Sequence, residues 1–300
     1  MVLSLWSGFF DALGLEEAMR ELAAAGFGHT EIAWEMSVEP GATSFSEQWF
    51  ERVRQAAASA EIATPQLHYP IRTLNPRVVP AGEHDPELEA DLAHPQEGRR
   101  RFEIDCLEQL IGLCPRSGVR VIVLHPGGCR GVEGARELDR VRALNVEALS
   151  HLAPLAARHG VNLALENMAR VGGKRQFGAA IRELQEVLRA VGAPNLGVCL
   201  DTSHARLAGE DIPAAIESLG QTLVATHISD NLGTHDDHLL PYSGTIDWPP
   251  VLAALERVGY AGLLNLEIPG EIACPLPILR LKARHALRLL ELMSGAGDPG

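Results

Sequence analysis

The sequence predicts an α/β fold, a closed (β/α)₈ barrel, from two observations. Short apolar runs alternate with longer amphipathic segments along all 300 residues. The short runs are almost continuously apolar, which is typical of parallel strands buried on both faces. Eight such repeats in a row favour a barrel, and no composition break divides the chain. We therefore expect residues 1–300 to form one domain.

Each predicted strand is rich in aliphatic and β-branched residues and ends at polar or turn residues. The eight runs cover residues 2–6, 29–34, 62–68, 119–125, 161–167, 195–201, 223–229 and 262–268. The alternative is an open doubly wound sheet. That fold would favour a G-x-G-x-x-G turn after the first strand, and WSGFFDALG at residues 6–14 contains none.

The predicted helices lie between the strands, and several are followed by a glycine suited to a helix C-terminus. They cover residues 15–26, 45–60, 99–118, 138–160, 179–192, 212–220, 248–259 and 278–293. Before the helix at Trp248, we expect Gly244 to permit a turn and Asp247 to serve as the N-cap.

Composition excludes several classes of protein. Lys and Arg total 26 against 39 Asp and Glu, the net charge is −13, and no segment forms an evident basic stripe, which argues against a nucleic-acid partner. Five cysteines without a C-x-x-C pair indicate neither a disulfide framework nor a thiolate metal site. The N-terminal segment lacks a basic leader and no apolar run is long enough to span a membrane. We therefore expect a cytoplasmic protein.

Two predicted loops, residues 69–95 and 229–246, are longer than a connection requires. Both follow strands and would lie on the same face of a barrel. Loops of this length inside a compact domain are usually functional or mobile; for the first, a disordered surface insertion is the alternative.

The carboxyl ends of the predicted strands carry metal-binding types of side chain, and in a barrel these ends meet at one mouth. They are Glu35, His68, His125, Glu166, Asp201, His204, His227 and Glu267. One such residue alone is more often a hydrogen-bonded polar group than a ligand. So many acids at one mouth would repel each other unless protons or a cation neutralised them. We expect a divalent metal, and carboxylate with imidazole suits Zn²⁺, Mn²⁺, Co²⁺ or Fe²⁺.

Five motifs resemble the xylose isomerase-like TIM-barrel superfamily. They are LALEN at 163–167, GVCLDTSHARLAG at 197–209, THISDN at 226–231, HDDHLLPYSGTIDW at 235–248 and LNLEI at 264–268. The superfamily includes sugar and sugar-phosphate isomerases and epimerases as well as apurinic endonucleases. The resemblance runs along essentially the whole chain and rests on the combination of motifs.

The two branches imply different metal sites on partly shared residues. In the isomerase branch, the resemblance implies one metal held by Glu166, Asp201, His227 and Glu267. In the endonuclease branch, it implies three zinc ions that use those four residues together with His68, His125, His204, Asp236 and His238. The ligand set alone therefore does not separate the branches.

The resemblance favours a sugar or sugar-phosphate isomerase or epimerase that abstracts a proton through a metal-stabilised ene-diolate, with Glu166 and Glu267 as the acid/base pair. His204, Asp236 and His238 could bind hydroxyls, shuttle a proton or hold further metal. An endonuclease-like phosphodiesterase or another metallohydrolase is the second hypothesis; two lysines and a large negative charge weigh against a polyanionic substrate. A non-catalytic metal-binding barrel is the third.

Four residues are candidates for contact with a small carbohydrate substrate. Trp6 and Trp34 could wall the apolar face of a sugar, with core packing as the alternative. Arg72 and Arg77 could pair with a phosphate or carboxylate, with ordinary loop surface as the alternative. The identity of the sugar is open, and a homo-oligomer is compatible with the sequence.

Overall fold

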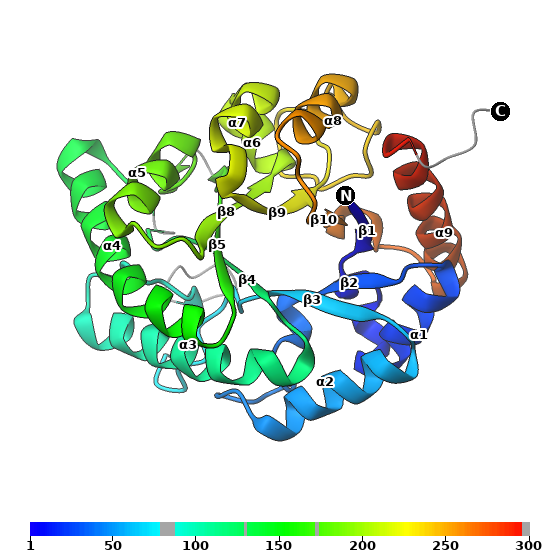
Figure 1. Cartoon of the computed structure of the whole chain (residues 1–300), viewed down its shortest axis with the longest axis horizontal. Helices are drawn as coiled ribbons and strands as arrows, with labels where there is room; N and C mark the ends of the chain where they lie inside the picture. Colours follow the sequence, from blue (N-terminus) through cyan, green and yellow to red (C-terminus); the bar gives the residue numbers. More distant parts are fainter. Residues whose placement is uncertain (79–87, 129–130, 172–173, 296–300) are drawn as a thin grey trace.

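The computed structural model describes residues 1–78, 88–128, 131–171 and 174–295. Parallel strands form a ring and helices surround it (Figure 1), which confirms the predicted barrel. The strands of the ring are β1 (Val2–Leu5), β2 (His29–Ile32), β3 (Ala63–His68), β4 (Val121–Leu124), β5 (Asn162–Glu166), β8 (Leu196–Asp201), β9 (Leu223–Ile228) and β10 (Leu263–Leu266).

The eight-stranded sheet has the order β1-β10-β9-β8-β5-β4-β3-β2, so β1 and β2 are its two ends. Two hydrogen bonds, each between a side chain and a backbone group, connect these ends. The Thr30 hydroxyl donates to the Leu5 carbonyl at 2.7 Å, and the Ala33 amide donates to the Ser7 hydroxyl at 2.9 Å. The barrel is therefore nearly closed, and every strand ends at the same mouth.

Helices follow the strands as the sequence predicts. They are α1 (Leu15–Ala25), α2 (Glu47–Ser59), α3 (Glu97–Ser117), α4 (Gly134–Arg158), α5 (Ile181–Val191), α7 (Ile212–Leu219), α8 (Trp248–Arg257) and α9 (Leu276–Met293). Two features were not predicted from the sequence. They are α6 (Thr202–Ala208), directly after β8, and the short hairpin of β6 (Arg170–Val171) and β7 (Lys174–Arg175). In the described part of the chain, no helix combines the length and apolarity that a membrane span requires.

Helix α5 illustrates how the outer layer attaches to the barrel. Ile181, Leu184, Val187 and Leu188 are spaced by three and four residues, so they share one face and are buried. Burial of each such side chain contributes about 1.5–3 kcal/mol relative to exposure. Gly192 ends the helix in the left-handed conformation, at φ 66°.

Six predicted strands end one or two residues earlier than the sequence suggests, and two of them lead into a 3₁₀ helix. β1 ends at Leu5 and β2 at Ile32, and in both places the chain turns into a 3₁₀ helix, η1 (Ser7–Leu13) and η2 (Trp34–Met36). Trp6 therefore precedes η1, and Trp34 and Glu35 lie in η2 rather than in the strand. A strand-to-3₁₀ turn leaves little trace in hydrophobic periodicity, because the apolar residues continue through it.

The barrel interior beneath the mouth divides into two halves. On β4, β5, β8 and β9, an apolar cluster is formed by Val123, Ala164, Cys199 and Ala225. On β1, β2, β3 and β10, Ser4, Glu31, Gln66 and Asn265 form hydrogen bonds with one another. Side chains alternate along a strand, so on six of these strands the residue two positions further on points into the mouth and is a metal-ligand type. Those six residues are His68, His125, Glu166, Asp201, His227 and Glu267.

The loop after β9 is folded around the buried carboxylate of Asp230. This carboxylate accepts five hydrogen bonds, from the amides of Asn231, Tyr242, Thr245 and Ile246 and from the Trp248 indole. The backbones of Asp230 and Leu239 also exchange two hydrogen bonds, at 2.9 and 2.8 Å. The loop is therefore held at several points along its length.

Gly244 is required in this loop, for a reason other than the expected turn conformation. Its φ lies outside the left-handed region. A Cβ at this position would lie 2.3 Å from both the Asn231 carbonyl oxygen and Asp230 Oδ1. Asp247 occupies the N-cap position of α8 as predicted, but its side chain makes no capping hydrogen bond.

We predict that Gly244→Ala lowers the free energy of unfolding by about 1–3 kcal/mol, because the added methyl group displaces the Asp230 carboxylate. Gly112→Ala is the control. Gly112 is exposed within α3, nothing lies within 4 Å of an added Cβ, and alanine there stabilises a helix by about 0.5–1 kcal/mol. Urea unfolding of the wild-type protein and both variants measures the difference. If Gly244→Ala has the same unfolding midpoint as Gly112→Ala, the close approach of Gly244 to Asp230 and Asn231 is refuted.

Candidate metal centre

The predicted metal-binding residues converge at the mouth of the barrel. Among the described residues, four groups have ligand atoms that all lie within 4.8 Å of one another. They are His68, His125 and Glu166; His68, His227 and Glu267; Asp201, His204 and His238; and Glu166, Asp201, His227 and Glu267. The last group is the set that the family resemblance implied for a single metal.

Glu166, at the end of β5, lies at the centre of the cluster. Its Oε1 is 2.9 Å from His227 Nδ1, and its Oε2 is 3.1 Å from His68 Nε2 and 3.3 Å from His125 Nε2. The same His227 nitrogen is 3.2 Å from Glu267 Oε2. The carboxylates of Glu166, at the end of β5, and Glu267, directly after β10, therefore meet at one imidazole nitrogen on β9.

A second group lies beside the first. Asp236 Oδ2 is 3.0 Å from His204 Nε2 and 3.1 Å from His238 Nε2, while Asp236 Oδ1 accepts from the Ser203 hydroxyl at 2.8 Å. His238 has a φ of 44°, a conformation that costs energy for a residue with a side chain. The loop described above therefore brings Asp236 and His238 to the mouth, beside His204. The sequence had left the role of these two residues open.

Asp201 supports the presence of a cation at this place. Its Oδ1 accepts the backbone amide of His204 at 2.8 Å and so begins α6. Its Oδ2 is buried and has no hydrogen-bond partner. A buried carboxylate oxygen without a partner is costly, and the donor set around it matches what divalent transition metals prefer. The residues present therefore fit a metal ion.

Hydrogen bonds to backbone carbonyl oxygens orient His68 and His204. His68 Nδ1 lies 2.7 Å from the Tyr69 carbonyl, and His204 Nδ1 lies 2.8 Å from the Asn167 carbonyl. A carbonyl only accepts, so these nitrogens carry the proton, and the neutral rings direct an Nε2 lone pair at a carboxylate. In His227 both ring nitrogens face carboxylates, because Nε2 lies 3.0 Å from Glu31 and Nδ1 faces Glu166 and Glu267. A lone pair facing a carboxylate at this distance requires a proton or a cation between them.

In the absence of a cation, protons lie between the histidine nitrogens and the carboxylate oxygens. Burial lowers the pKa of His68, but the hydrogen bond and charge of Glu166 outweigh it and raise the pKa to about 9. Burial likewise opposes a raised pKa in His238, and the hydrogen bond to Asp236 brings the pKa to about 9. For Glu267, burial raises the pKa, but the charge and hydrogen bond of His227 lower it to about 2.

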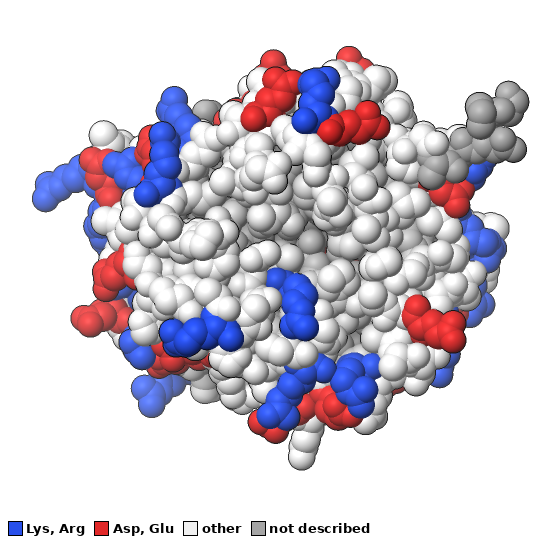
Figure 2. Space-filling view, viewed as in Figure 1, with Lys and Arg blue, Asp and Glu red and all other residues white. Residues whose placement is uncertain are grey.

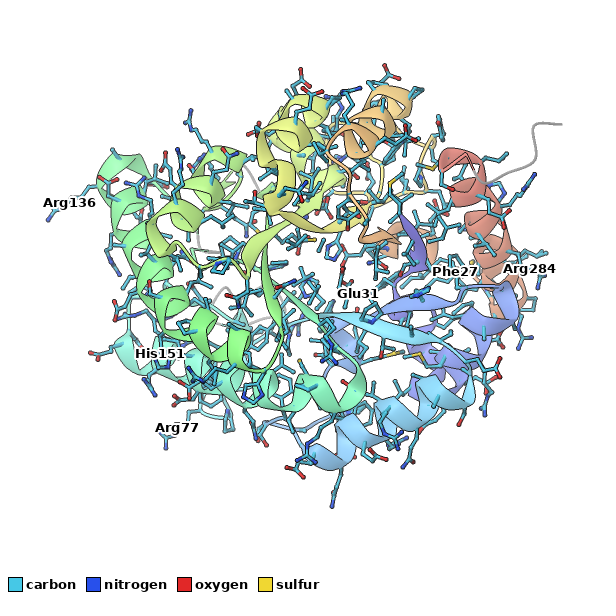
Figure 3. All side chains as sticks on the ribbon, in the orientation of Figure 1. Phe27, Glu31, Arg77, Arg136, His151 and Arg284 are labelled. Atoms are coloured by element: carbon cyan, nitrogen blue, oxygen red, sulfur yellow. The ribbon has the colours of Figure 1, made fainter. Side chains whose placement is uncertain are left out.

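Sequence reasoning missed Glu31, on β2, and assigned no role to Glu35. Glu31 lies inside the ring of strands (Figure 3) and contacts His227. Glu35 has a buried Oε2 without a hydrogen-bond partner, and burial followed by the charges of Asp11 and Glu267 raises its pKa to about 7. Counting back from Glu35 in steps of two residues reaches Ala33 and then Glu31, so the alternation of side chains along a strand would have marked Glu31 as inward-facing.

The four candidates for substrate contact differ in their placement. Trp6 is 2% exposed and packs edge-to-face on Phe9, which is the core packing that the sequence left as the alternative. Trp34 is half-buried in η2. Arg72 is exposed and its backbone pairs with that of Glu89. Arg77 is exposed and lies at the periphery, away from the ring of strands (Figure 3).

Charge is distributed in small patches on the face in Figure 2. Acidic and basic side chains are interspersed around the rim, and the centre of this face, where the strands meet, is mostly uncharged. Within the described residues, this face therefore carries no continuous basic surface.

The fold and the cluster together define a (β/α)₈ barrel with a histidine–carboxylate centre at its mouth. A family profile described as "xylose isomerase-like TIM barrel" matches residues 19–292. The chain belongs to this family.

Its relatives have different activities. Inosose isomerase of Bacillus velezensis is 25% identical over 181 residues, which cover 58% of this chain and 61% of that protein. A probable endonuclease 4 of Mesoplasma florum is 31% identical over 171 residues, which cover 55% of this chain and 53% of that protein. The chain therefore aligns with only about half to three fifths of these relatives. The crystal structure of D-psicose 3-epimerase in the presence of D-fructose has a TM-score of 0.76 at 18% identity, covering 98% of this chain and 100% of that one, which shows a shared fold.

We predict that binding of Zn²⁺ at pH 7.5 releases protons. The pKa values of about 9 for His68 and His238 lie above this pH, so both rings are protonated in the absence of metal. A cation bound by Glu166, Asp201 and Glu267 would neutralise charges that raise these two pKa values, and the protons would then leave. Affinity should therefore rise with pH up to about 9. Titration calorimetry in two buffers of different ionisation enthalpy counts the protons, and a heat that does not depend on the buffer would contradict this prediction.

Proposed function

We propose that the chain is a divalent-metal-dependent isomerase or epimerase of a sugar or sugar phosphate. The observation that carries this proposal is the group of Glu166, Asp201, His227 and Glu267, whose ligand atoms lie within 4.8 Å of one another. The relationship to inosose isomerase supports the same chemistry. The net charge of −13 favours a small substrate over a polyanion.

The two glutamates would transfer the protons. One carboxylate removes a proton from the carbon beside the substrate carbonyl, and the opposite carboxyl group returns a proton to the other face of that carbon or to the neighbouring carbon. A bound divalent cation would polarise the substrate oxygens and stabilise the negative charge that develops on them. Burial of Glu166 at 1% exposure excludes water from the transfer, and the histidines fix the position of its oxygens.

A second candidate is a multinuclear phosphodiesterase of the apurinic endonuclease type. The observation that favours it is the size of the cluster, because His68, His125, His204, Asp236 and His238 surround the four residues named above and provide further metal-binding groups. The relationship to endonuclease 4 agrees with this reading. A metal-binding barrel without turnover is the third candidate.

Solvent-deuterium exchange tests the proposed function. Metal-loaded protein in D₂O should incorporate deuterium into at least one member of a panel of ketoses and ketose phosphates. Glu166→Gln and Glu267→Gln should each reduce the exchange rate by about 10²–10⁴-fold, because each removes a proton-transfer group. Glu108→Gln, on α3 outside the mouth, is a control with unchanged exchange.

An abasic-site DNA nicking assay on the same preparations separates the candidates. Exchange without nicking supports the isomerase or epimerase, and nicking without exchange reverses the order of the two candidates. If neither occurs while metal binds, the third candidate is favoured. Exchange that persists in both glutamate variants would refute their assignment.

Metal analysis gives an independent prediction. About one equivalent of divalent metal per chain is expected for the proposed isomerase or epimerase, bound by the four-residue group. About three equivalents would favour the phosphodiesterase. Inductively coupled plasma mass spectrometry of purified protein measures the ratio, and protein that takes up no metal on reconstitution would rule out the centre.

A further inference from the structure

Glu31 is a carboxylate inside the barrel, below the mouth. It lies on β2, its exposure is 0%, and it belongs to none of the metal-binding groups found among the described residues. Burial of a carboxylate is costly, and is tolerated where charge and hydrogen bonds compensate. The groups that compensate the buried charge of Glu31 therefore indicate its role.

The carboxylate accepts three hydrogen bonds from three other strands. Oε2 accepts from Gln66 Nε2 on β3 at 2.6 Å and from His227 Nε2 on β9 at 3.0 Å. Oε1 accepts from Asn265 Nδ2 on β10 at 3.1 Å. The side-chain oxygen of Asn265, Oδ1, in turn accepts from the Ser4 hydroxyl on β1 at 2.7 Å. Among these partners, His227 is the one that can carry a positive charge.

A purely structural network would not need a charge at this place. Gln66 and Asn265 are neutral amides, and a third amide could complete the same hydrogen bonds. The negative charge of Glu31 instead acts on His227. With a cation bound on the Nδ1 side of the ring, next to Glu166 and Glu267, this charge would hold the remaining ring proton on Nε2 and make the ring a stronger donor to that cation.

We propose that Glu31 is a positioning residue that fixes the tautomer and orientation of His227 and strengthens the binding of a divalent cation at its Nδ1. The proposal rests on the metal centre of the proposed function. It concerns the affinity of that centre rather than the reaction, so it applies to either catalytic candidate.

Glu31→Gln tests the proposal with little disturbance of the network. The new amide oxygen can accept from Gln66 and His227, and the new NH₂ group then faces Asn265. If the Asn265 amide turns over, its oxygen accepts that NH₂ group and its own NH₂ group donates to the Ser4 hydroxyl, which can rotate. All hydrogen bonds are then retained and only the charge is lost.

We expect the dissociation constant for Zn²⁺, measured by chelator competition, to rise about 10–100-fold in Glu31→Gln. The far-ultraviolet circular dichroism should not change. Ser4→Ala is the matched control, because it removes one hydrogen bond of the same network and leaves Glu31 and His227 in place. It should lower the thermal midpoint while leaving the Zn²⁺ dissociation constant within about twofold of the wild-type value.

A second measurement needs no variant. In Zn²⁺-loaded wild-type protein, the ¹⁵N chemical shifts of His227 should show a protonated Nε2 and a metal-bound Nδ1; the opposite tautomer would overturn the proposal even if Glu31→Gln does not fold. Equal Zn²⁺ affinity in Glu31→Gln and wild type would overturn it while the metal centre stands, as would an equal loss in Ser4→Ala. Failure of the wild-type protein to bind Zn²⁺, Mn²⁺ or Co²⁺ would overturn the metal centre and this proposal together.

Discussion

Carboxylate oxygens and imidazole lone pairs face each other at the mouth of this barrel, and the arrangement requires positive charge between them. Glu166 meets His68, His125 and His227 within 3.3 Å. In a buried site, two acceptors this close repel strongly unless a proton or a metal ion separates them. The raised pKa of about 9 for His68 and His238 and the unpaired oxygen of Asp201 are consequences of this single constraint.

The barrel can impose this constraint because its strands are rigid and in register. Asp201 is paired with His227 across β8 and β9, and His227 with Asn265 across β9 and β10, so backbone hydrogen bonds fix the spacing of neighbouring side chains. Asp236 and His238 lie on a loop, which would ordinarily be less precise. The Asp230 carboxylate compensates by holding that loop through five hydrogen bonds.

The sequence predicted the barrel and most of the cluster because both follow from short-range patterns. Glu166, Asp201 and Glu267 each interrupt an apolar run at its end, and parallel strands bring such ends together. Glu31 escaped detection because it lies within a run read as continuing to Trp34, whereas β2 ends at Ile32. The strand-end rule therefore pointed to Glu35, at the neighbouring 3₁₀ turn.

The conformation of the loop after β9 could not be predicted from short-range sequence patterns. Its shape depends on which backbone amides reach Asp230, and those amides belong to residues up to sixteen positions away. No spacing of side-chain types encodes that geometry. For the same reason, Gly244 was recognisable as special, but the close approach that excludes a side chain there was not.

The division of the barrel interior into an apolar and a polar half has a consequence for how such a protein can change. The apolar half, Val123, Ala164, Cys199 and Ala225, determines how much volume lies beneath Glu166 and Asp201. In the polar half, Glu31 contacts one ring nitrogen of His227 and places a carboxylate next to that ring. Substitutions of these four apolar residues and of the polar residues Ser4, Gln66 and Asn265 therefore alter different properties. The volume beneath the mouth and the polar surroundings of His227 can therefore change separately within one fold.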